Sequence, residues 1–232
     1  MRLDRWISNN TALSRQAVRS AVKAKQVQVN GVTATRADMP VNEIDTVLLN
    51  GEPVQLQQAR YFMLHKPAGY VCANSDSEHP VVLDLLDEQN KHTLQIAGRL
   101  DLDTTGLVLI TDDGQWNHRV TAPTRQCCKT YCVTLDAPLT EAAAEQLRNG
   151  VLLQGEKQST QPAELVFADA GNRQAVLLSI TEGKYHQVKR MFAAVGYHVT
   201  ALHREQVGDI TLDVTLPPGT YRPLTPIEIA SI

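Results

Sequence analysis

The chain has no long hydrophobic run. In 232 residues, no apolar stretch approaches the ~20 residues that a membrane-spanning helix requires. The opening sequence MRLDRW also lacks the apolar core of a secretory signal. Hydrophobic residues make up 43% of the chain and charged residues 20%, which is ordinary for a soluble globular protein. We therefore expect a cytoplasmic protein.

Cysteines are few, and their spacing does not indicate a metal site. No Cys-x-x-Cys pair and no His-rich segment is present, as a zinc site would require. The sequence also lacks a Gly-rich phosphate loop and a dinucleotide-binding fingerprint. We therefore expect reduced thiols, no metal and no cofactor. The four cysteines are Cys72, Cys127, Cys128 and Cys132.

Basic residues do not dominate the chain, but they are concentrated at its start. The formal net charge is −3. Residues 1–36 nevertheless hold seven Lys or Arg residues and one acid, a net charge of +6. The remaining 196 residues hold 15 bases and 24 acids, a net charge of −9. Because the distribution of charge matters more than its sum for binding nucleic acid, RNA is not excluded as a partner.

A basic helix is predicted at residues 14–26. Ser14 can cap its first turn, because its hydroxyl can accept a hydrogen bond from a free backbone amide. Arg15, Arg19 and Lys23 are four residues apart, so they form one stripe on the helix surface. Such a stripe is either a solvated face or a site for RNA phosphates. We favour phosphates, because no acid interrupts the stripe in the sequence.

The first 56 residues are predicted to form a small domain of their own. Residues 27–33 (VQVNGVT) alternate around Asn-Gly, which predicts a tight hairpin. Residues 46–54 predict a second strand pair. The polar residues 57–60 are interpreted as a linker, and residues 61–232 as a second domain.

The second domain is predicted to combine strands with a few helices. Short runs rich in branched or aromatic residues predict strands, and two segments with helical spacing predict helices. Strand and helix do not alternate regularly, so we expect an α+β fold with a mixed, mainly antiparallel sheet and packed helices. The predicted strands are 61–64, 107–110, 131–135 and 175–180, and the predicted helices are 140–149 and 186–195.

Residues 2–54 resemble the alpha-L RNA-binding module. The likeness rests on RLD at residues 2–4, on Ser14-Arg15 at the start of the basic helix, and on VQVNG at residues 27–31. The resemblance implies binding to structured RNA through the basic helix and the loop that follows it.

Residues 97–106 (AGRLDLDTTG) place two acids, a base and two hydroxyls beside a predicted strand. Taken alone, this run can be a polar turn in which Asp and Thr bond their own backbone. The spacing of Asp101, Asp103 and Thr105 also fits the nucleophile loop of haloacid dehalogenase-type phosphatases, but the hydrophobic strand follows the loop here instead of preceding it. A calcium loop is a third option, but its last position would need a bidentate Glu where this chain has Asp112.

The same run resembles the signature of the RsuA/RluA-type pseudouridine synthases. Three other segments resemble further motifs of that family, in the family's order: HKPAG at 65–69, KTYCV at 129–133 and EGKYHQVKRM at 182–191. An RNA-binding head ahead of these motifs is typical of the RsuA branch. The resemblance implies that the chain converts uridine in RNA to pseudouridine without a cofactor.

The resemblance also implies roles for individual residues. Asp101 is the catalytic carboxylate, acting as a nucleophile at the ribose or in removal of its proton. Lys189 is its counter-ion, with Arg190 either as the alternative partner or as a contact to the RNA. Tyr131 stacks on the target uracil once that base has left the RNA stack, and Arg99 fills or braces the vacated space.

Peripheral contacts and the substrate are further expectations. Lys66, His203 and Arg204 are either plain surface charges or contacts to phosphates near the entrance of the site. His186 and Gln187 are expected to position their loop. The compact length and the likeness to the RsuA branch predict that the chain modifies one uridine of small-subunit (16S) rRNA. We also expect a monomer. Large-subunit rRNA, tRNA, or a non-catalytic role in ribosome assembly are the alternatives.

Overall fold

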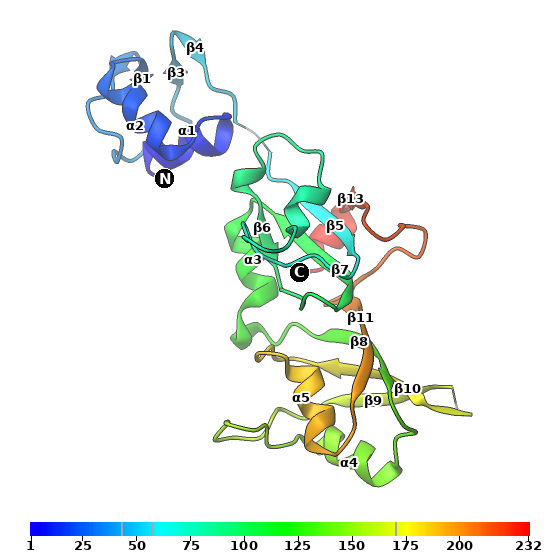
Figure 1. Cartoon of the computed structure of the whole chain (residues 1–232). Helices are drawn as coiled ribbons and strands as arrows, with labels where there is room; N and C mark the ends of the chain where they lie inside the picture. The colour runs from blue at the N-terminus through cyan, green and yellow to red at the C-terminus, as the bar shows by residue number, and fades with distance from the viewer. Residues whose placement is uncertain (43, 57, 170) are drawn as a thin grey trace. The chain divides into compact units, whose positions relative to one another are not determined.

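The computed structural model describes residues 1–42, 44–56, 58–169 and 171–232, and the chain divides into two compact units (Figure 1). One unit comprises Met1–Ala59 and Asp87–Leu94, and the other comprises Arg60–Leu86 and Gln95–Ile232. The predicted linker at 57–60 includes residue 57, which lies outside the described residues. Among the residues that are described, no helix has the length and apolar character needed to cross a bilayer.

The first unit combines two short helices with a four-stranded sheet. The strands pair in the order β2-β1-β3-β4, and all the pairings are antiparallel. Apolar side chains of the helices and strands form one core, which includes Leu3, Ile7, Val18, Val27 and Val47. The elements are α1 (Leu3–Asn10), α2 (Arg15–Lys23), β1 (Val27–Val29), β2 (Val32–Thr33), β3 (Val47–Leu49) and β4 (Glu52–Pro53).

The basic helix α2 begins where the sequence predicts. The Ser14 hydroxyl accepts a hydrogen bond from the Ala17 amide at 3.2 Å, which confirms Ser14 as the N-cap. The helix ends at Lys23, three residues earlier than predicted. It stops there because the chain turns at Lys25, whose φ of 59° is left-handed.

Both predicted hairpins of the first unit are present. Asn30 and Gly31 join β1 to β2 with φ angles of 51° and 79°, and Asn50 and Gly51 join β3 to β4 with 54° and 85°. Positive φ at both central residues is what a two-residue hairpin turn needs, and Asn-Gly tolerates it best. The Asn-Gly pairs therefore set the register of the β1–β2 and β3–β4 hairpins.

The second unit is built on a nine-stranded sheet. Its main path runs β13-β5-β7-β11-β8-β10-β9, with β6 paired to β7 and β12 paired to β11. Among the described pairings of named strands, β7 with β11 is parallel and the others are antiparallel, so the predicted mixed, mainly antiparallel sheet is confirmed. The strands are β5 (Tyr61–Lys66), β6 (Gln95–Ala97), β7 (Thr105–Thr111), β8 (Lys129–Leu135), β9 (Glu164–Asp169), β10 (Asn172–Ile180), β11 (Val199–Val207), β12 (Ile210–Thr211) and β13 (Tyr221–Pro223).

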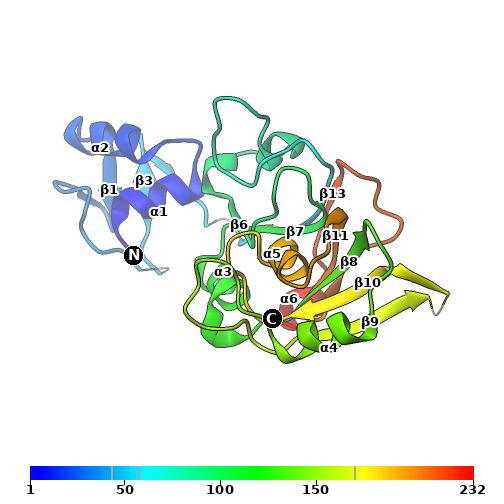
Figure 2. The ribbon, with the colours of Figure 1, turned by 60° about the horizontal axis from the view of Figure 1, so that its bottom comes forward.

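Helices pack beside this sheet at several places (Figure 2). Helix α3 contacts β6 and β7, α4 contacts β9, and α5 contacts β11. The helices predicted at 140–149 and 186–195 correspond to α4 and α5, whereas α3 and α6 were not predicted. The α-helices are α3 (Gly114–Thr121), α4 (Glu141–Asn149), α5 (Gln187–Ala194) and α6 (Pro226–Ala230), and the 3-10 helices of the chain are η1 (Val82–Leu85), η2 (Lys91–Thr93) and η3 (Pro123–Arg125).

Strand β7 is the centre of the second unit. Leu107, Val108, Leu109 and Ile110 are all fully buried, so side chains on both faces of this strand are covered. This explains the unbroken apolar run in the sequence, because a strand buried on both faces does not alternate with polar residues. The buried strand therefore holds the adjoining end of the loop before it in a fixed position.

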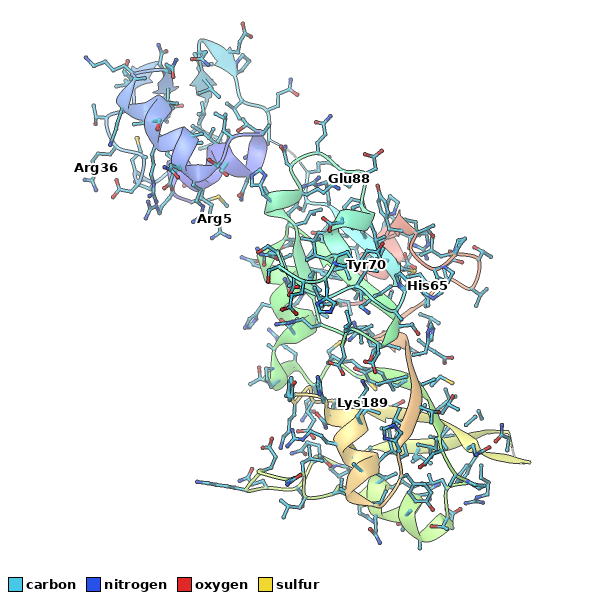
Figure 3. The ribbon with its side chains drawn as sticks, viewed as in Figure 1. Arg5, Arg36, His65, Tyr70, Glu88 and Lys189 are labelled. Carbon is cyan, nitrogen blue, oxygen red and sulfur yellow. The ribbon has the colours of Figure 1, made fainter. Side chains whose placement is uncertain are left out.

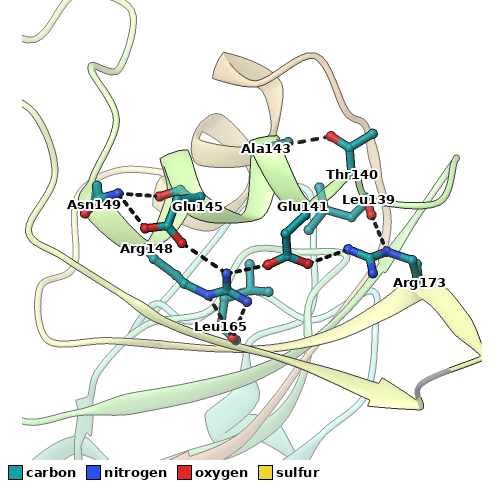
Figure 4. A network of polar contacts seen from close by, with 9 residues as sticks. All are labelled: Leu139, Thr140, Glu141, Ala143, Glu145, Arg148, Asn149, Leu165 and Arg173. Carbon is teal, nitrogen blue, oxygen red and sulfur yellow. Dashed lines mark hydrogen bonds and ion pairs between the residues drawn. The ribbon is translucent and has the colours of Figure 1, made fainter.

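Charged side chains fix α4 against the neighbouring strands (Figure 4). Arg148 lies 2.7 Å from Glu141 and also donates to the carbonyl of Leu165 in β9. Arg173 in β10 donates to the same Glu141 at 2.8 Å and to the carbonyl of Leu139. The two guanidinium groups, Arg148 first, lower the pKa of Glu141. The network is partly exposed, so we assign it to orientation of α4 more than to stability.

Candidate active site

A cavity of about 730 Å³ in the second unit is lined by parts of three of the four sequence motifs. Residues 98–102 and 104 contribute from the loop before β7, two residues contribute from β8, and residues 180–189 contribute from the segment that leads into α5. These segments are far apart in the sequence. The sheet brings them together because β7, β11 and β8 are neighbours in it.

Gly106 lets the loop that carries Asp101 pass directly into the sheet. Its φ is +109°, and an added Cβ would lie 2.2 Å from the carbonyl oxygen of Arg204 in β11. No other residue type fits there without moving the backbone. The parallel pairing of β7 with β11, which joins Thr105 to His203 and Gly106 to Arg204, thus includes this glycine and fixes where the loop ends.

Arg204 holds both ends of this loop from below. Its side chain is 1% exposed, and the guanidinium donates to the carbonyls of Leu107 at 2.9 Å, Gly98 at 2.9 Å and Arg99 at 3.5 Å. A buried cation with three carbonyl acceptors is satisfied in place. The expected phosphate contact is wrong for Arg204, because its guanidinium already has these partners inside the protein.

Lys66 is the second buried cation under the loop. Its ammonium donates to the carbonyls of Thr104 at 2.6 Å, Pro67 at 3.1 Å and Leu102 at 3.2 Å, and the residue is fully buried. Burial lowers the pKa of Lys66. The expected phosphate contact is wrong here also, for the same reason. Together the two cations clamp the backbone on both sides of Asp101.

Asp101 faces the cavity with two basic side chains beside it. Lys189, at the start of α5, places its ammonium 3.7 Å from one carboxylate oxygen (Figure 3 labels Lys189). His186 places Nε2 3.4 Å from the other. The Asp101 side chain is 29% exposed, so both the protein and an incoming ligand can reach it. The carboxylate is therefore presented in a basic environment.

Lys189 has a closer partner than Asp101. Its ammonium lies 2.6 and 2.8 Å from the two oxygens of Asp103, and this contact lowers the pKa of Asp103. The lysine therefore bridges two carboxylates, of which Asp103 is the more exposed. Arg190, the alternative partner, contacts Glu156 at 3.4 Å and the carbonyl of Gln154 at 2.7 Å instead. Geometry favours Lys189 over Arg190 as the cation beside Asp101.

Tyr131 and Arg99 both line the cavity that Asp101 lines. Tyr131 is on β8, lines the cavity and is 8% exposed, so one buried aromatic ring forms part of the wall. Arg99 is exposed and lines the same cavity two residues before Asp101. The structure thus brings Tyr131, Arg99 and Asp101 to one space.

His203 lies away from the cavity. Leu202 and Arg204 line it, and successive side chains of a strand point to opposite faces. The His203 Nδ1 is 2.8 Å from the hydroxyl of Thr105, and its ring lies 5.5 Å from that of His65. Burial, and then His65, lower the pKa of His203. This side chain therefore points away from the cavity, and its phosphate contact stays a prediction.

Several residues of the cavity wall were not predicted from the sequence. Glu182, Lys129 and Tyr185 lie inside recognised motifs. Their place in those motifs is the feature of the sequence that could have indicated a position at the site. Cys72 carried no signal, because a lone cysteine resembles any buried thiol. Its sulfur accepts a hydrogen bond from the amide of Leu100 at 3.3 Å, and burial raises its pKa. All four line the cavity.

In the first unit, the stripe on α2 is present but not free of acids. Arg15, Arg19 and Lys23 are all exposed. Arg19 places Nε 3.2 Å from the carboxylate of the buried Asp4, a partner that sequence spacing did not show. Arg5 and Arg36, labelled in Figure 3, are also exposed on this unit. The unit therefore keeps a basic surface.

Residues 60–194 match the family described as RNA pseudouridylate synthase, which is more than half of the chain. The chain belongs to this family. Residues 1–47 match the S4 domain. The resemblance stated from the motifs is thereby confirmed.

Full-length relatives of this pseudouridylate synthase family member are similar along the whole chain. It is 52% identical over 233 residues to the ribosomal small subunit pseudouridine synthase A of Yersinia pestis, with 100% of this chain and 98% of that protein covered. It is 50% identical to the protein of the same name in Escherichia coli (strain K12), with both chains covered completely. A crystal structure of a pseudouridylate synthase superposes with a TM-score of 0.72 at 44% identity, covering 100% and 99% of the two chains.

Proposed function

We propose that this protein isomerises one uridine of small-subunit ribosomal RNA to pseudouridine, with Asp101 as the catalytic carboxylate. One observation carries the proposal: Asp101, Lys189 and Tyr131 come from three distant segments and line one cavity. The relatives named as small-subunit pseudouridine synthases support the choice of RNA.

The reaction needs few chemical groups from the protein. The bond between the ribose and nitrogen 1 of uracil breaks, the base turns, and carbon 5 is joined to the ribose in its place. Carbon 5 loses its proton and nitrogen 1 gains one, so substrate and product contain the same atoms. A carboxylate can serve as the nucleophile at the ribose or remove its proton. Asp101 has the exposure required for either route.

The other cavity residues receive roles that suit their surroundings. Lys189 balances the charge of Asp101. Tyr131 offers its ring to the uracil once that base has left the RNA stack. Arg99, exposed beside Asp101, braces the RNA at the vacated position. Arg190 orients the start of α5 through its bonds to neighbouring backbone.

Binding of the surrounding RNA is assigned to the basic head. We assign residues 1–56 to RNA binding through Arg15, Arg19 and Lys23, and residues 61–232 to catalysis. Contacts between basic side chains and phosphates position the RNA without reading its sequence. We further propose a cytoplasmic monomer that needs no metal, which sedimentation of the pure protein and assay in excess chelator test directly.

Mapping of pseudouridine tests the reaction. Purified wild-type protein is incubated with 16S rRNA, either naked or partly assembled with ribosomal proteins, and every pseudouridine is mapped. We expect one new site, absent with Asp101→Asn. Modification of large-subunit rRNA or tRNA instead would correct the substrate. Binding without any product would establish the rival function, an assembly factor that retains the synthase fold.

Deletion of the head tests its share of the binding. A protein that lacks residues 1–56 should bind the rRNA more weakly, and its binding should depend less steeply on salt, because fewer phosphates are neutralised. The circular dichroism of the remaining domain shows whether it is folded. Unchanged affinity and salt dependence would refute the role of the head.

A further inference from the structure

One aromatic side chain in the cavity wall is open to solvent. Of the eleven Phe, Trp and Tyr residues, all of which lie in the described part of the chain, Tyr185 alone is exposed, at 77%. It lines the same cavity as Tyr131, which is 8% exposed. The cavity therefore has a buried ring and an exposed ring. A single exposed ring is ordinary on a protein surface, so the contacts around Tyr185 decide whether it is a binding site.

The Tyr185 ring is held in place by its neighbours. One of its faces stacks on the ring of His186, with centroids 3.8 Å apart and planes 21° apart. Its carbonyl accepts a hydrogen bond from Arg190 at 3.0 Å. Among the described residues, no second ring contacts the other face, which agrees with the exposure of the side chain. Tyr185 is thus a fixed platform with one open side.

The stack is also tied to Asp101. His186 has a φ of +46°, a left-handed conformation that residues with side chains rarely adopt. In this conformation the edge of its ring reaches Asp101, at 3.4 Å, while its face meets Tyr185. Strained backbone of this kind persists where the surrounding structure maintains a functional geometry.

The segment that carries both rings is anchored from beneath. Gln187 is 4% exposed, accepts from the amide of Lys184 at 2.8 Å and donates to Glu182 at 2.6 Å. Glu182 in turn accepts from the amide of Gln161 at 2.9 Å. These bonds fix the backbone on both sides of Tyr185.

We propose that the open face of Tyr185 stacks on a nucleobase adjacent to the target uridine, as a second base subsite beside Tyr131. This inference rests on the proposed function. When the target base leaves the strand to reach Asp101, its neighbour loses a stacking partner. An aromatic ring accepts any base, because every base has a π face. Tyr185 replaces the lost partner and stabilises the opened RNA.

Charges near Tyr185 indicate that this contact is through the ring. Lys184 and Arg190 both pair with Glu156, at 3.5 and 3.4 Å. These two cations are therefore partly neutralised within the protein. Loss of the Tyr185 ring should weaken RNA binding without changing its salt dependence, unlike loss of a phosphate contact.

The test uses a short RNA hairpin that contains the uridine mapped with the wild-type protein. Binding is measured with the Asp101→Asn protein, here called the parent, which should not convert the uridine. It is also measured with the parent carrying Tyr185→Leu or Tyr185→Phe in addition. Three hairpins are compared: one intact, and one with an abasic nucleotide on either side of the target. Tyr197→Leu is the control, since Tyr197 lies outside the cavity wall.

We expect Tyr185→Leu to weaken binding of the intact hairpin about tenfold and Tyr185→Phe to bind like the parent. An abasic nucleotide on one side of the target should weaken binding by the parent by the same factor as Tyr185→Leu does. The same abasic nucleotide should cause little further loss of affinity in Tyr185→Leu. A 2-aminopurine at that position should be quenched by the parent and not by Tyr185→Leu. Any of four results would overturn the inference. Tyr185→Leu could bind the intact hairpin as tightly as the parent, or Tyr185→Phe could lose as much affinity as Tyr185→Leu. The loss from Tyr185→Leu could add fully to the loss from an abasic nucleotide on either side, or Tyr185→Leu could change the salt slope. Absence of pseudouridine from both naked and partly assembled 16S rRNA after incubation with the wild-type protein would instead refute the proposed function.

Discussion

The two regions on which the proposal rests use basic side chains in opposite ways. At the cavity, Lys66 and Arg204 are buried and donate to backbone carbonyls around Asp101. On α2 of the head, Arg15 and Lys23 are exposed. A reacting carboxylate needs a fixed position, which buried bonds give it. Binding of phosphates needs charge that solvent and RNA can reach. Burial, more than residue type, therefore separates the two tasks.

The same comparison holds between neighbouring carboxylates. Asp101 and Asp103 share Lys189, but Asp103 is the more exposed and makes the shorter contact. If position at the cavity decides function, Asp101→Asn should lower turnover about a thousandfold or more, while Asp103→Asn should cost less than about tenfold. Single-turnover assays on 16S rRNA measure both. Equal losses would show that the two acids act as one unit.

Removal of a buried cation should affect stability where removal of an exposed one does not. Arg204→Met leaves the carbonyls of Gly98 and Leu107 without their donor, so we expect a loss of about 3 kcal/mol in the free energy of unfolding. Arg15→Met, the matched change on α2, should cost less than about 0.5 kcal/mol. Urea denaturation measures both. A stable Arg204→Met protein with full activity would show that the loop does not depend on this clamp.

Lys189 and Arg190 offer a comparison within one helix. Lys189→Met removes the cation 3.7 Å from Asp101, and we expect kcat to fall about tenfold to a hundredfold. Arg190→Met removes a cation that contacts Glu156 instead, so kcat should change much less. Assays at saturating RNA distinguish the two. The reverse order would identify Arg190 as the functional partner of Asp101.

The head should respond in affinity and salt dependence. Combined Arg15→Gln and Lys23→Gln should weaken rRNA binding several-fold and lower the slope of log affinity against log salt by about two, one for each phosphate contact. Arg36→Gln is the control, because Arg36 is paired with Asp38 at 2.9 Å. Turnover at saturating RNA should be unchanged in both variant proteins. A slope that does not move would mean that the stripe is merely solvated.

Local signals in the sequence predict the parts of this molecule that depend on few residues. A cap at Ser14 and an Asn-Gly turn are each decided within a few positions, and both are found. Asp101 could be proposed as the catalytic carboxylate because its whole loop forms one motif. Strand β11 was missed, because its sequence, VTALHREQV, mixes polar and apolar residues where it crosses between β7 and β8.

Burial of charge could not be predicted in the same way. Lys66 and Arg204 resemble surface residues in the sequence, since Lys and Arg are rarely buried without partners. Their partners are carbonyls up to 38 and 106 positions away in the chain. Sequence patterns do not report such contacts, because every residue has a carbonyl. The orientation of His203 away from the cavity likewise follows from strand register.

The smallest effect should appear in the dependence of stability on pH. Burial and the nearby His65 lower the pKa of His203 from its ordinary 6.5, so the folded protein keeps this ring neutral where the unfolded chain binds a proton. This contribution to stability is complete above pH 6.5 and declines as the pH falls toward the lowered pKa. His203→Gln should flatten the fall in urea midpoint between pH 7.5 and 5. Residues 1–59 contain no histidine, so the deletion protein that lacks residues 1–56 should keep the whole effect. An identical pH profile for His203→Gln would show that this ring contributes nothing to the fall.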